Sequence, residues 1–219
     1  MREIKLKAYT DASSFNNGKK NPSLPEHSAS AGVILMESND TIYIIDSVYT
    51  YNPNSSISYG EIIAIYNILS RVEYLASNVD DNVSLLLHSD SAYCVQAIND
   101  WMPNWKKHQR KGIWIKSSGD PVAYQSIFEE IDRILNLDNL SIEIRHIAGH
   151  IDVKDKNHVN KAMKNYLRFN KKELSAETLC KHTYFNDMCD VYAKEVLRLG
   201  MRGELKNERK KRNFKKYFS

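Results

Sequence analysis

The sequence has few of the residues that mark several common protein classes. It contains 8 Gly and 5 Pro in 219 residues, which excludes collagen-like chains and chains dominated by linkers. No run of 18 apolar residues occurs, so we expect no membrane-spanning helix. The first residues are charged and lack the apolar core of a secretory signal. The 3 Cys form no CxxC pair, which argues against a disulfide framework or a zinc ribbon and favours a reducing compartment, the cytoplasm.

Positive charge is concentrated in three segments of a chain whose net charge is only +4. Residues 202–219 carry eight Lys or Arg against two Glu, residues 101–118 carry five against no acid, and residues 151–185 carry eight against four acids. The rest of the chain is therefore acidic. Basic patches on an acidic body are typical of phosphate binding, although a solvated surface with a basic tail has the same composition.

The pattern of apolar residues predicts an α/β fold. Strands are expected over 4–10, 31–36, 41–51, 83–87 and 142–147, a loop over 12–28, and a hairpin turn over 38–40. Helices are expected around Ile65 and Ile68, over 91–101, 122–137 and 188–199, and briefly near 159–169. Hairpin-linked strands followed by crossovers indicate a mixed sheet with helices on both faces. We expect one domain over 1–200, with a basic insertion at 151–185 and a basic tail at 201–219.

Four carboxylates occupy positions that packing alone does not explain. Asp11 ends the first strand and Asp90 follows the strand over 83–87, and parallel strands bring such residues to one edge of a sheet. Glu61 lies on the apolar face of its helix, where an unpaired charge is costly, and Asp190 lies in the last helix. Each could instead cap a helix, begin a turn or face solvent. Gathered together, they would repel one another unless a divalent cation, Mg²⁺ or Mn²⁺, were bound.

A histidine and a group of aromatic residues complete the candidate site. His150 follows the fifth strand and can titrate near neutral pH, although an exposed loop histidine would do the same. All three Trp lie within the basic stretch 101–114. Aromatic surface beside lysines suits contact with bases, sugars and phosphates, while at least one Trp could belong to an ordinary core. The candidate nucleic-acid-binding residues are Trp101, Trp105, Lys106, Lys107 and Trp114.

In their order along the chain, these motifs resemble ribonuclease H type I, the bacterial-like enzymes that cut RNA in RNA–DNA hybrids. The basic stretch 101–114 is similar to the handle with which that family grips DNA. The resemblance covers most of residues 4–200. It rests on the segments Tyr9-Thr-Asp-Ala-Ser13, Glu61-Ile-Ile-Ala64, Ser89-Asp-Ser-Ala-Tyr93, Gly149-His150 and Asn186-Asp-Met-Cys-Asp190.

The resemblance implies a fold, a cofactor and a reaction. The fold is a ribonuclease H-like five-stranded mixed sheet in the order 3-2-1-4-5, with helices on both faces. Asp11, Glu61, Asp90 and Asp190 would hold two Mg²⁺ ions, which Mn²⁺ could replace, and His150 would assist proton transfer or product release. The reaction would be endonucleolytic hydrolysis of the RNA strand of an RNA–DNA hybrid, giving 5′-phosphate and 3′-hydroxyl ends. We expect a monomer that binds the hybrid duplex and no membrane.

The sequence departs from the family where the family reads the hybrid. Ile57, Ser58 and Ala92 stand where Asn and Gln are usual, and Tyr124 or Gln125 replaces a further Asn. Ser58 or Gln125 could make the contacts to the hybrid that those Asn and Gln residues make in the family. Two alternatives stay open, namely a DNA-directed nuclease of the same fold, such as a junction resolvase or an integrase-like enzyme, and a non-catalytic nucleic-acid-binding module.

Overall fold

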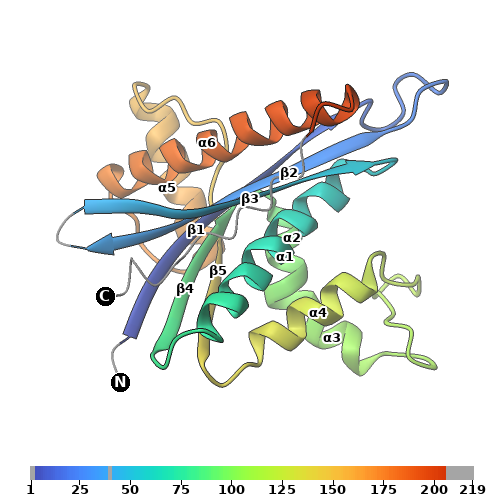
Figure 1. Cartoon of the computed structure of the whole chain (residues 1–219), viewed down its shortest axis with the longest axis horizontal. Coiled ribbons are helices and arrows are strands. Elements are labelled where there is room, and N and C mark those ends of the chain that lie inside the picture. The colour runs from blue at the N-terminus through green and yellow to red at the C-terminus, as the bar shows by residue number, and fades with distance from the viewer. Residues whose placement is uncertain (1–2, 39–40, 206–219) are drawn as a thin grey trace.

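The computed structural model describes residues 3–38 and 41–205, and within them five strands form one mixed sheet in the order β3-β2-β1-β4-β5. Strand β1 pairs antiparallel with β2 and parallel with β4, while β2–β3 is antiparallel and β4–β5 is parallel. The predicted strand order is confirmed (Figure 1). The strands are β1 (Glu3–Phe15), β2 (His27–Ser38), β3 (Thr41–Pro53), β4 (Asn82–Ser89) and β5 (Leu140–His146).

Helices cover both faces of the sheet, as predicted. Helix α1, with α4 beside it, packs against one face, and α6 packs against the other (Figure 1). Neighbouring strand residues point to opposite faces, so Ile34 joins the core beneath α1 while Val33 and Leu35 join the core beneath α6. The helices are α1 (Ile57–Ala76), α2 (Ala92–Gln96), the π-helix η1 (Ala97–Trp101), α3 (Met102–Lys107), α4 (Gln125–Leu135), α5 (Lys156–Asn170) and α6 (Ala176–Met201).

Short polar side chains fix where the helices near the carboxylates begin. The Ser56 side chain accepts a hydrogen bond from the backbone N–H of Tyr59 at the start of α1, and Ser91 caps α2 in the same way. At Gly60, an added Cβ would lie 3.0 Å from the Ser28 side chain. The absence of a side chain there lets the first turn of α1 approach the sheet closely.

Two boundaries differ from the sequence-based expectation. Strand β1 runs on to Phe15 because its antiparallel pairing with β2 continues as far as Phe15 opposite His27. The loop is therefore 16–26 rather than 12–28, and Asp11 lies inside β1 rather than at its end. Helix α6 begins at Ala176 instead of 188. Its first turns bury a mixture of apolar and polar residues, including His182 and Thr183, which hides the apolar stripe in the sequence.

The segment 151–185 contains all of α5 and the first turns of α6, so the helix expected near 159–169 is confirmed. Part of the expected turn, residues 39–40, and most of the basic tail, residues 206–219, lie outside the described residues. Across 3–38 and 41–205, no helix combines the length and the apolar character needed to span a membrane.

Candidate active site

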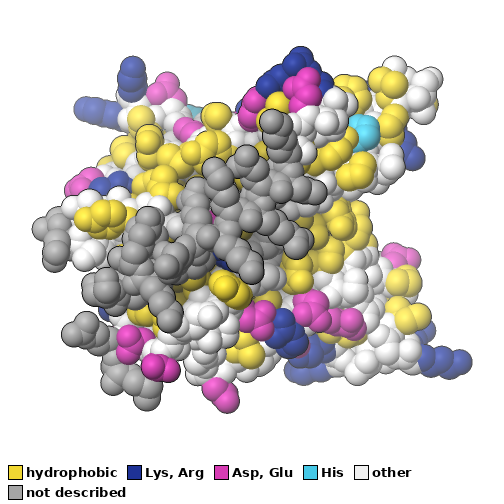
Figure 2. All heavy atoms as spheres, in the orientation of Figure 1, with side chains coloured by type: hydrophobic (Ala, Val, Ile, Leu, Met, Phe, Trp, Pro, Cys, Tyr) yellow, Lys and Arg dark blue, Asp and Glu magenta, His cyan; other side chains and the backbone are white. Residues whose placement is uncertain are grey.

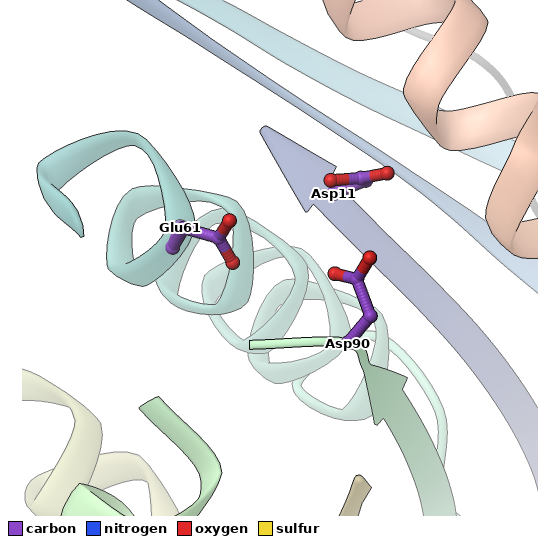
Figure 3. Close-up of side chains that lie close together, drawn as sticks. All are labelled: Asp11, Glu61 and Asp90. Atoms are coloured by element: carbon purple, nitrogen blue, oxygen red, sulfur yellow. The ribbon is translucent and has the colours of Figure 1, made fainter. Parts of the chain in front are cut away.

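Three of the four expected carboxylates converge at one edge of the sheet. Asp11 lies one residue beyond the last parallel pair of β1 and β4, Thr10 opposite Ser89, and Asp90 directly follows β4. Glu61 reaches the same point from the first turns of α1. Figure 3 shows the three side chains turned toward one another, and one oxygen from each lies within 4.8 Å of the others. The fold thus places three negative groups in one small volume.

Burial and repulsion both disfavour the charged forms of these groups. Burial is the main cause that raises the pKa of Asp11, and the charges of Asp90 and Glu61 raise it further. Burial raises the pKa of Glu61 to about 7, and the Asp90 charge adds to that shift. The pKa of Asp90 is also raised by burial. Without a counter-charge, the cluster therefore destabilises its own ionised state.

The donor atoms suit a hard divalent cation. All three are carboxylate oxygens, the ligands that Mg²⁺ and Mn²⁺ prefer. The Oε2 atom of Glu61 is buried and has no hydrogen-bond partner among the described residues, so it is free to coordinate an ion. In contrast, Oδ1 of Asp11 accepts a hydrogen bond of 2.6 Å from the backbone N–H of Ala12, which fixes the orientation of that carboxylate. The residues present therefore fit a metal site.

The fourth carboxylate, Asp190, lies outside the group of three whose oxygens are within 4.8 Å of one another, so its role as a fourth metal ligand stays a prediction. Its Oδ2 accepts a hydrogen bond of 2.6 Å from the Nζ atom of Lys194, one turn further along α6. Asp190 is still close enough that its charge adds to the burial that raises the pKa of Asp11 and Asp90. An internal cation thus occupies the carboxylate that the resemblance assigns to metal.

His150 lies at the solvent side of the cluster. It is exposed, its backbone has a φ of 50°, and its charge opposes the burial that raises the pKa of Asp90. The preceding Gly149 packs so closely on Asp90 that a Cβ there would overlap the Oδ2 atom of that carboxylate. Any larger residue at 149 would therefore push Asp90 or the His150 loop away.

Two neighbours of the carboxylates were not among the candidate site residues. Asn186, the first residue of the last motif, is buried, and its side-chain Nδ2 donates a hydrogen bond of 3.4 Å to Oδ2 of Asp90. Lys194 is the ion-pair partner of Asp190. The spacing of four residues between Asp190 and Lys194 is the signal that could have found this pair. The contact between Asn186 and Asp90 spans 96 positions and leaves no comparable signal in the sequence.

The tryptophans of the basic stretch fall into two classes. Trp105 and Trp114 are each only 6% exposed and belong to the main core, and Trp105 packs edge-on against Phe128. The prediction that they offer ring surface to a nucleic acid is therefore corrected, because neighbouring side chains cover both rings. Trp101 is 36% exposed and packs edge-on against Tyr93, so it alone of the three presents substantial aromatic surface.

The segment 102–124, which we call the protrusion, extends away from the sheet at the α3 end of the molecule (Figure 1). Lys106 is paired with Asp132 at 2.6 Å, whereas Lys107 is exposed and has no described ion-pair partner. Lys and Arg side chains project from this end in Figure 2. A groove of about 870 Å³ runs beside Trp101, and Arg110 and Lys116 also line it.

Gln125, the first residue of α4, holds the protrusion in place, and its amide is not free to contact a substrate. Its side-chain oxygen accepts a hydrogen bond of 2.8 Å from the backbone N–H of Trp114, and its Nε2 donates to the carbonyl of Gly112 at 2.7 Å and to Glu129 at 2.6 Å. With both ends of its amide engaged, Gln125 closes the protrusion onto the start of α4.

The comparison with protein families decides how this fold and site are classified. A family model described as RNase H matches residues 3–198. The chain belongs to the RNase H family. The matched residues include all five strands, the three clustered carboxylates and the segment 151–185 that holds α5 and the start of α6.

Curated and solved relatives agree with this assignment. Ribonuclease H of Prochlorococcus marinus is 30% identical over 109 residues, covering 50% of this chain and 61% of the relative. Ribonuclease H of Clostridium botulinum is 34% identical over 94 residues, covering 42% and 59%. The matched part thus spans about three fifths of these relatives. The solved PFV RNase H domain has a TM-score of 0.56 at 17% identity and covers 90% of this chain and 97% of that one, which shows the fold.

Asp11→Asn should stabilise the metal-free chain above neutral pH. Because folding raises the pKa of Asp11 and of Glu61, the folded state binds these protons more tightly than the unfolded chain. For Asp11 the resulting stability is present below about pH 4 and is lost as the pH rises through about 9, and for Glu61 it is present below about pH 4.5 and is lost through about 7. Removing one charge relieves that loss, so the free energy of unfolding in EDTA at pH 8 should rise by about 1–3 kcal/mol.

Thermal melts at pH 4.5 and pH 8, with EDTA or with Mg²⁺, measure this effect. The gap between variant and wild type should close at pH 4.5 and shrink when Mg²⁺ is added at pH 8. Asp80→Asn, at an exposed position, is the matched control and should leave the melts unchanged. A variant that melts below wild type in EDTA at pH 8 would contradict the electrostatic account of the cluster.

Lys194→Met should strengthen the binding of divalent ions. The substitution keeps most of the side-chain volume but frees Asp190 from its ammonium partner. Because the lysine is largely exposed, the expected gain is modest, about two- to fivefold in affinity. Isothermal titration of the EDTA-treated, dialysed protein with Mn²⁺ measures it directly. Lys181→Met, which breaks a similar pair with Glu177 on the same helix, is the control. Equal affinities for wild type and Lys194→Met would show that Lys194 does not compete with metal.

Proposed function

We propose that this chain is an endonuclease that hydrolyses the RNA strand of RNA–DNA hybrids with the help of two Mg²⁺ ions. The observation that carries the proposal is the convergence of Asp11, Glu61 and Asp90 within 4.8 Å on a fold of the RNase H family. Bound at these carboxylates, Mg²⁺ or its substitute Mn²⁺ would supply Lewis-acid activation of water and stabilisation of the leaving 3′-oxygen.

The protein's own groups have separate roles in this proposal. Asp11, Glu61 and Asp90 provide oxygen ligands from three rigid elements, and Asp190 completes the set once Lys194 releases it. Asn186 holds the Asp90 carboxylate in place through its hydrogen bond. His150, exposed beside Asp90, can accept a proton or assist release of the product, which would bear a 5′-phosphate next to a free 3′-hydroxyl.

The surface around the cluster supports a nucleic-acid duplex as the substrate. Trp101, just before the protrusion, lines the 870 Å³ groove together with the cations Arg110 and Lys116, so an aromatic stacking surface and positive charge meet there. Lys107 adds an exposed cation on the protrusion. The foamy viral protease-reverse transcriptase, solved in complex with an RNA/DNA hybrid, shares the fold with a TM-score of 0.56 at 15% identity over 89% of this chain. Curated relatives bear the name ribonuclease H. The groove suits a nucleic-acid duplex in general, and the name of the curated relatives is what points to a hybrid.

We infer that residues 1–200 form one RNase H domain that contains the insertion 151–185, and that residues 201–219 form a basic tail. The last helix, α6, ends at Met201, where this tail begins. The domain acts as a monomer in the cytoplasm. Among the described residues all three Cys are free thiols, which agrees with a reducing compartment.

Cleavage of a labelled RNA–DNA hybrid in the presence of Mg²⁺ tests the proposal. The wild-type chain should cut the RNA strand, and the products should carry 5′-phosphate and 3′-hydroxyl ends, read by ligation and by phosphatase treatment. Asp11→Asn and Asp90→Asn should each lower kcat by roughly 10³-fold or more, because each removes a ligand of the reacting centre. EDTA should abolish the reaction.

The controls distinguish the hybrid nuclease from its alternatives. Asp80→Asn should cut like wild type. Duplex DNA and a four-way junction, offered under the same conditions, should stay intact. Cutting of these DNA substrates without cutting of the hybrid would instead favour the DNA-directed nuclease, a result that the absence of the usual Asn and Gln at Ile57, Ser58 and Ala92 would explain. Binding without any cutting would leave only the non-catalytic module.

Trp101→Ala should raise KM for the hybrid more than it lowers kcat. The ring lies beside the groove rather than within the carboxylate cluster, and the loss of a stacking surface costs about 1–3 kcal/mol in binding. We expect KM to rise about fivefold or more with kcat changed less than twofold, measured by steady-state kinetics. Tyr74→Ala, another exposed aromatic residue, is the control. A fall in kcat with KM unchanged would place Trp101 outside the binding surface.

A further inference from the structure

Helix α5, within the inserted segment, is rigidly attached to the sheet. The side chain of Asn170 accepts a hydrogen bond of 2.9 Å from the backbone N–H of His146 and donates one of 2.7 Å to the His146 carbonyl. Arg145 donates to the hydroxyl of Tyr166 at 3.0 Å. Ala162 and Tyr166 are buried. The helix therefore keeps a fixed orientation relative to β5, and any side chain on its outer face has a defined position.

The outer face of α5 carries cations and no acids. Lys161, Lys164 and Arg168 are exposed, and their spacing of three and four residues places them on one side of the helix, opposite Ala162 and Tyr166. No Asp or Glu occurs anywhere in residues 156–172. None of the three cations has an ion-pair partner among the described carboxylates. Like charges at this spacing destabilise a helix by a few tenths of a kcal/mol per pair, roughly.

On two other long helices, α4 and α6, the cations are paired with acids. On α4, Arg133 pairs with Glu130 three residues earlier, and with Glu73 of α1. On α6, cations pair with acids three or four residues away, in the pairs Lys181–Glu177, Lys194–Asp190 and Arg198–Glu195. The missing acids on α5 are thus a local feature of this helix and not a general property of the surface.

Cations without an ion pair are concentrated in two parts of the described chain. Apart from Lys19, Lys20 and Arg202, every described Lys or Arg without an ion pair to a described carboxylate lies either in the protrusion or in residues 154–171. The protrusion is the surface already proposed to bind nucleic acid. The segment 154–171 likewise carries cations that have no ion pair to a described carboxylate. The two surfaces are nevertheless far apart in sequence and belong to different elements.

We propose that the Lys161, Lys164 and Arg168 face of α5 is a second surface that contacts the phosphate backbone of the nucleic-acid substrate; this rests on the proposed function. The first and last of these cations are seven residues apart, or about 10 Å along the helix. That length matches about three successive nucleotides of one strand at 3.4 Å each. The C-terminal end of α5 lies close to the carboxylate cluster. Its last residue, Asn170, bonds to His146, and Nε2 of His146 lies 3.2 Å from the backbone carbonyl oxygen of Asp90.

The composition of this face favours nucleic acid over an acidic protein. Leu167 is the only large apolar side chain exposed on α5. A stable protein interface requires a desolvated core of apolar or aromatic residues, and a single leucine does not provide one. A polyanion needs only accessible cations at the spacing of its phosphates, because the release of its counterions drives the association.

The triple variant Lys161→Gln, Lys164→Gln, Arg168→Gln tests this surface through the salt dependence of binding. Fluorescence anisotropy with a labelled RNA–DNA hybrid of about 20 base pairs, in EDTA so that no cleavage occurs, gives Kd at several KCl concentrations. Each lost phosphate contact lowers the slope of log Kd against log salt by about 0.9. We therefore expect the slope to fall by about two to three, and binding at low salt to weaken by at least tenfold.

The matched control removes the same charge from paired positions. The triple variant Lys5→Gln, Lys181→Gln, Arg198→Gln loses three cations that each have a carboxylate partner, and its slope should stay within about 0.5 of wild type. Both triple variants should melt within a few degrees of wild type, which confirms that they are folded. A second readout is duplex length. A hybrid shortened in steps from either end should lose the difference between wild type and the α5 variant once it no longer reaches α5.

The outcomes separate this inference from the proposed function. If the slope for the α5 variant is unchanged, or falls equally in the control, the surface does not contact phosphates and the inference is wrong, even if the hybrid is cleaved. Binding of an acidic protein at α5 would give this unchanged slope. If the slope falls for the α5 variant alone while no hybrid is cut with Mg²⁺, the surface is confirmed and the nuclease proposal fails.

Discussion

The repulsion between Asp11, Glu61 and Asp90 is the constraint on which the rest of this structure depends. Burial raises the pKa of all three groups, and neighbouring charges add to the shift at Asp11 and Glu61, so the cluster opposes folding in its ionised form. The fold nevertheless holds the three groups in place. The parallel register of β1 and β4 fixes Asp11 beside Asp90, and the close approach at Gly60 and Gly149 brings α1 and the His150 loop against them. The fold therefore concentrates the negative charge of three carboxylates at a point where a bound cation would neutralise it.

The protein itself supplies part of what stabilises the ionised carboxylates, through one neutral hydrogen-bond donor and two basic side chains. Asn186 donates a hydrogen bond to Asp90, His150 lies close to the same carboxylate, and Lys194 pairs with Asp190. None of these groups reaches Oε2 of Glu61, which has no hydrogen-bond partner among the residues that the structure describes. The internal partners therefore restrain the rim of the site and leave its centre open to an external ion. Lys194 neutralises Asp190 at this rim, while the other three carboxylates keep their oxygens turned toward one another.

Much of the fold could be predicted from the sequence because its signals are local. Alternation and apolar runs gave the strands, and the polar residues at strand ends indicated where Asp90 would lie. The contacts that were not predicted join residues far apart in the chain. Burial of Trp105 depends on Phe128, the charge of Lys106 is balanced by Asp132, and Asp90 is held by Asn186. A sequence shows which residues share a face of one element, but not which distant side chain will meet them.

The distribution of paired and unpaired cations extends the electrostatic argument from the site to the surface. On α4 and α6 the chain places acids beside its cations, so these surfaces are locally neutral. On α5, and on the protrusion apart from Lys106, it does not, although the body of the protein is acidic and acids would relieve the repulsion. Cations held apart from available carboxylates remain free for an anion from outside. A polyanion lying across both surfaces would bring its own phosphates near the carboxylate cluster, and this second concentration of negative charge would strengthen the attraction of the site for a divalent cation.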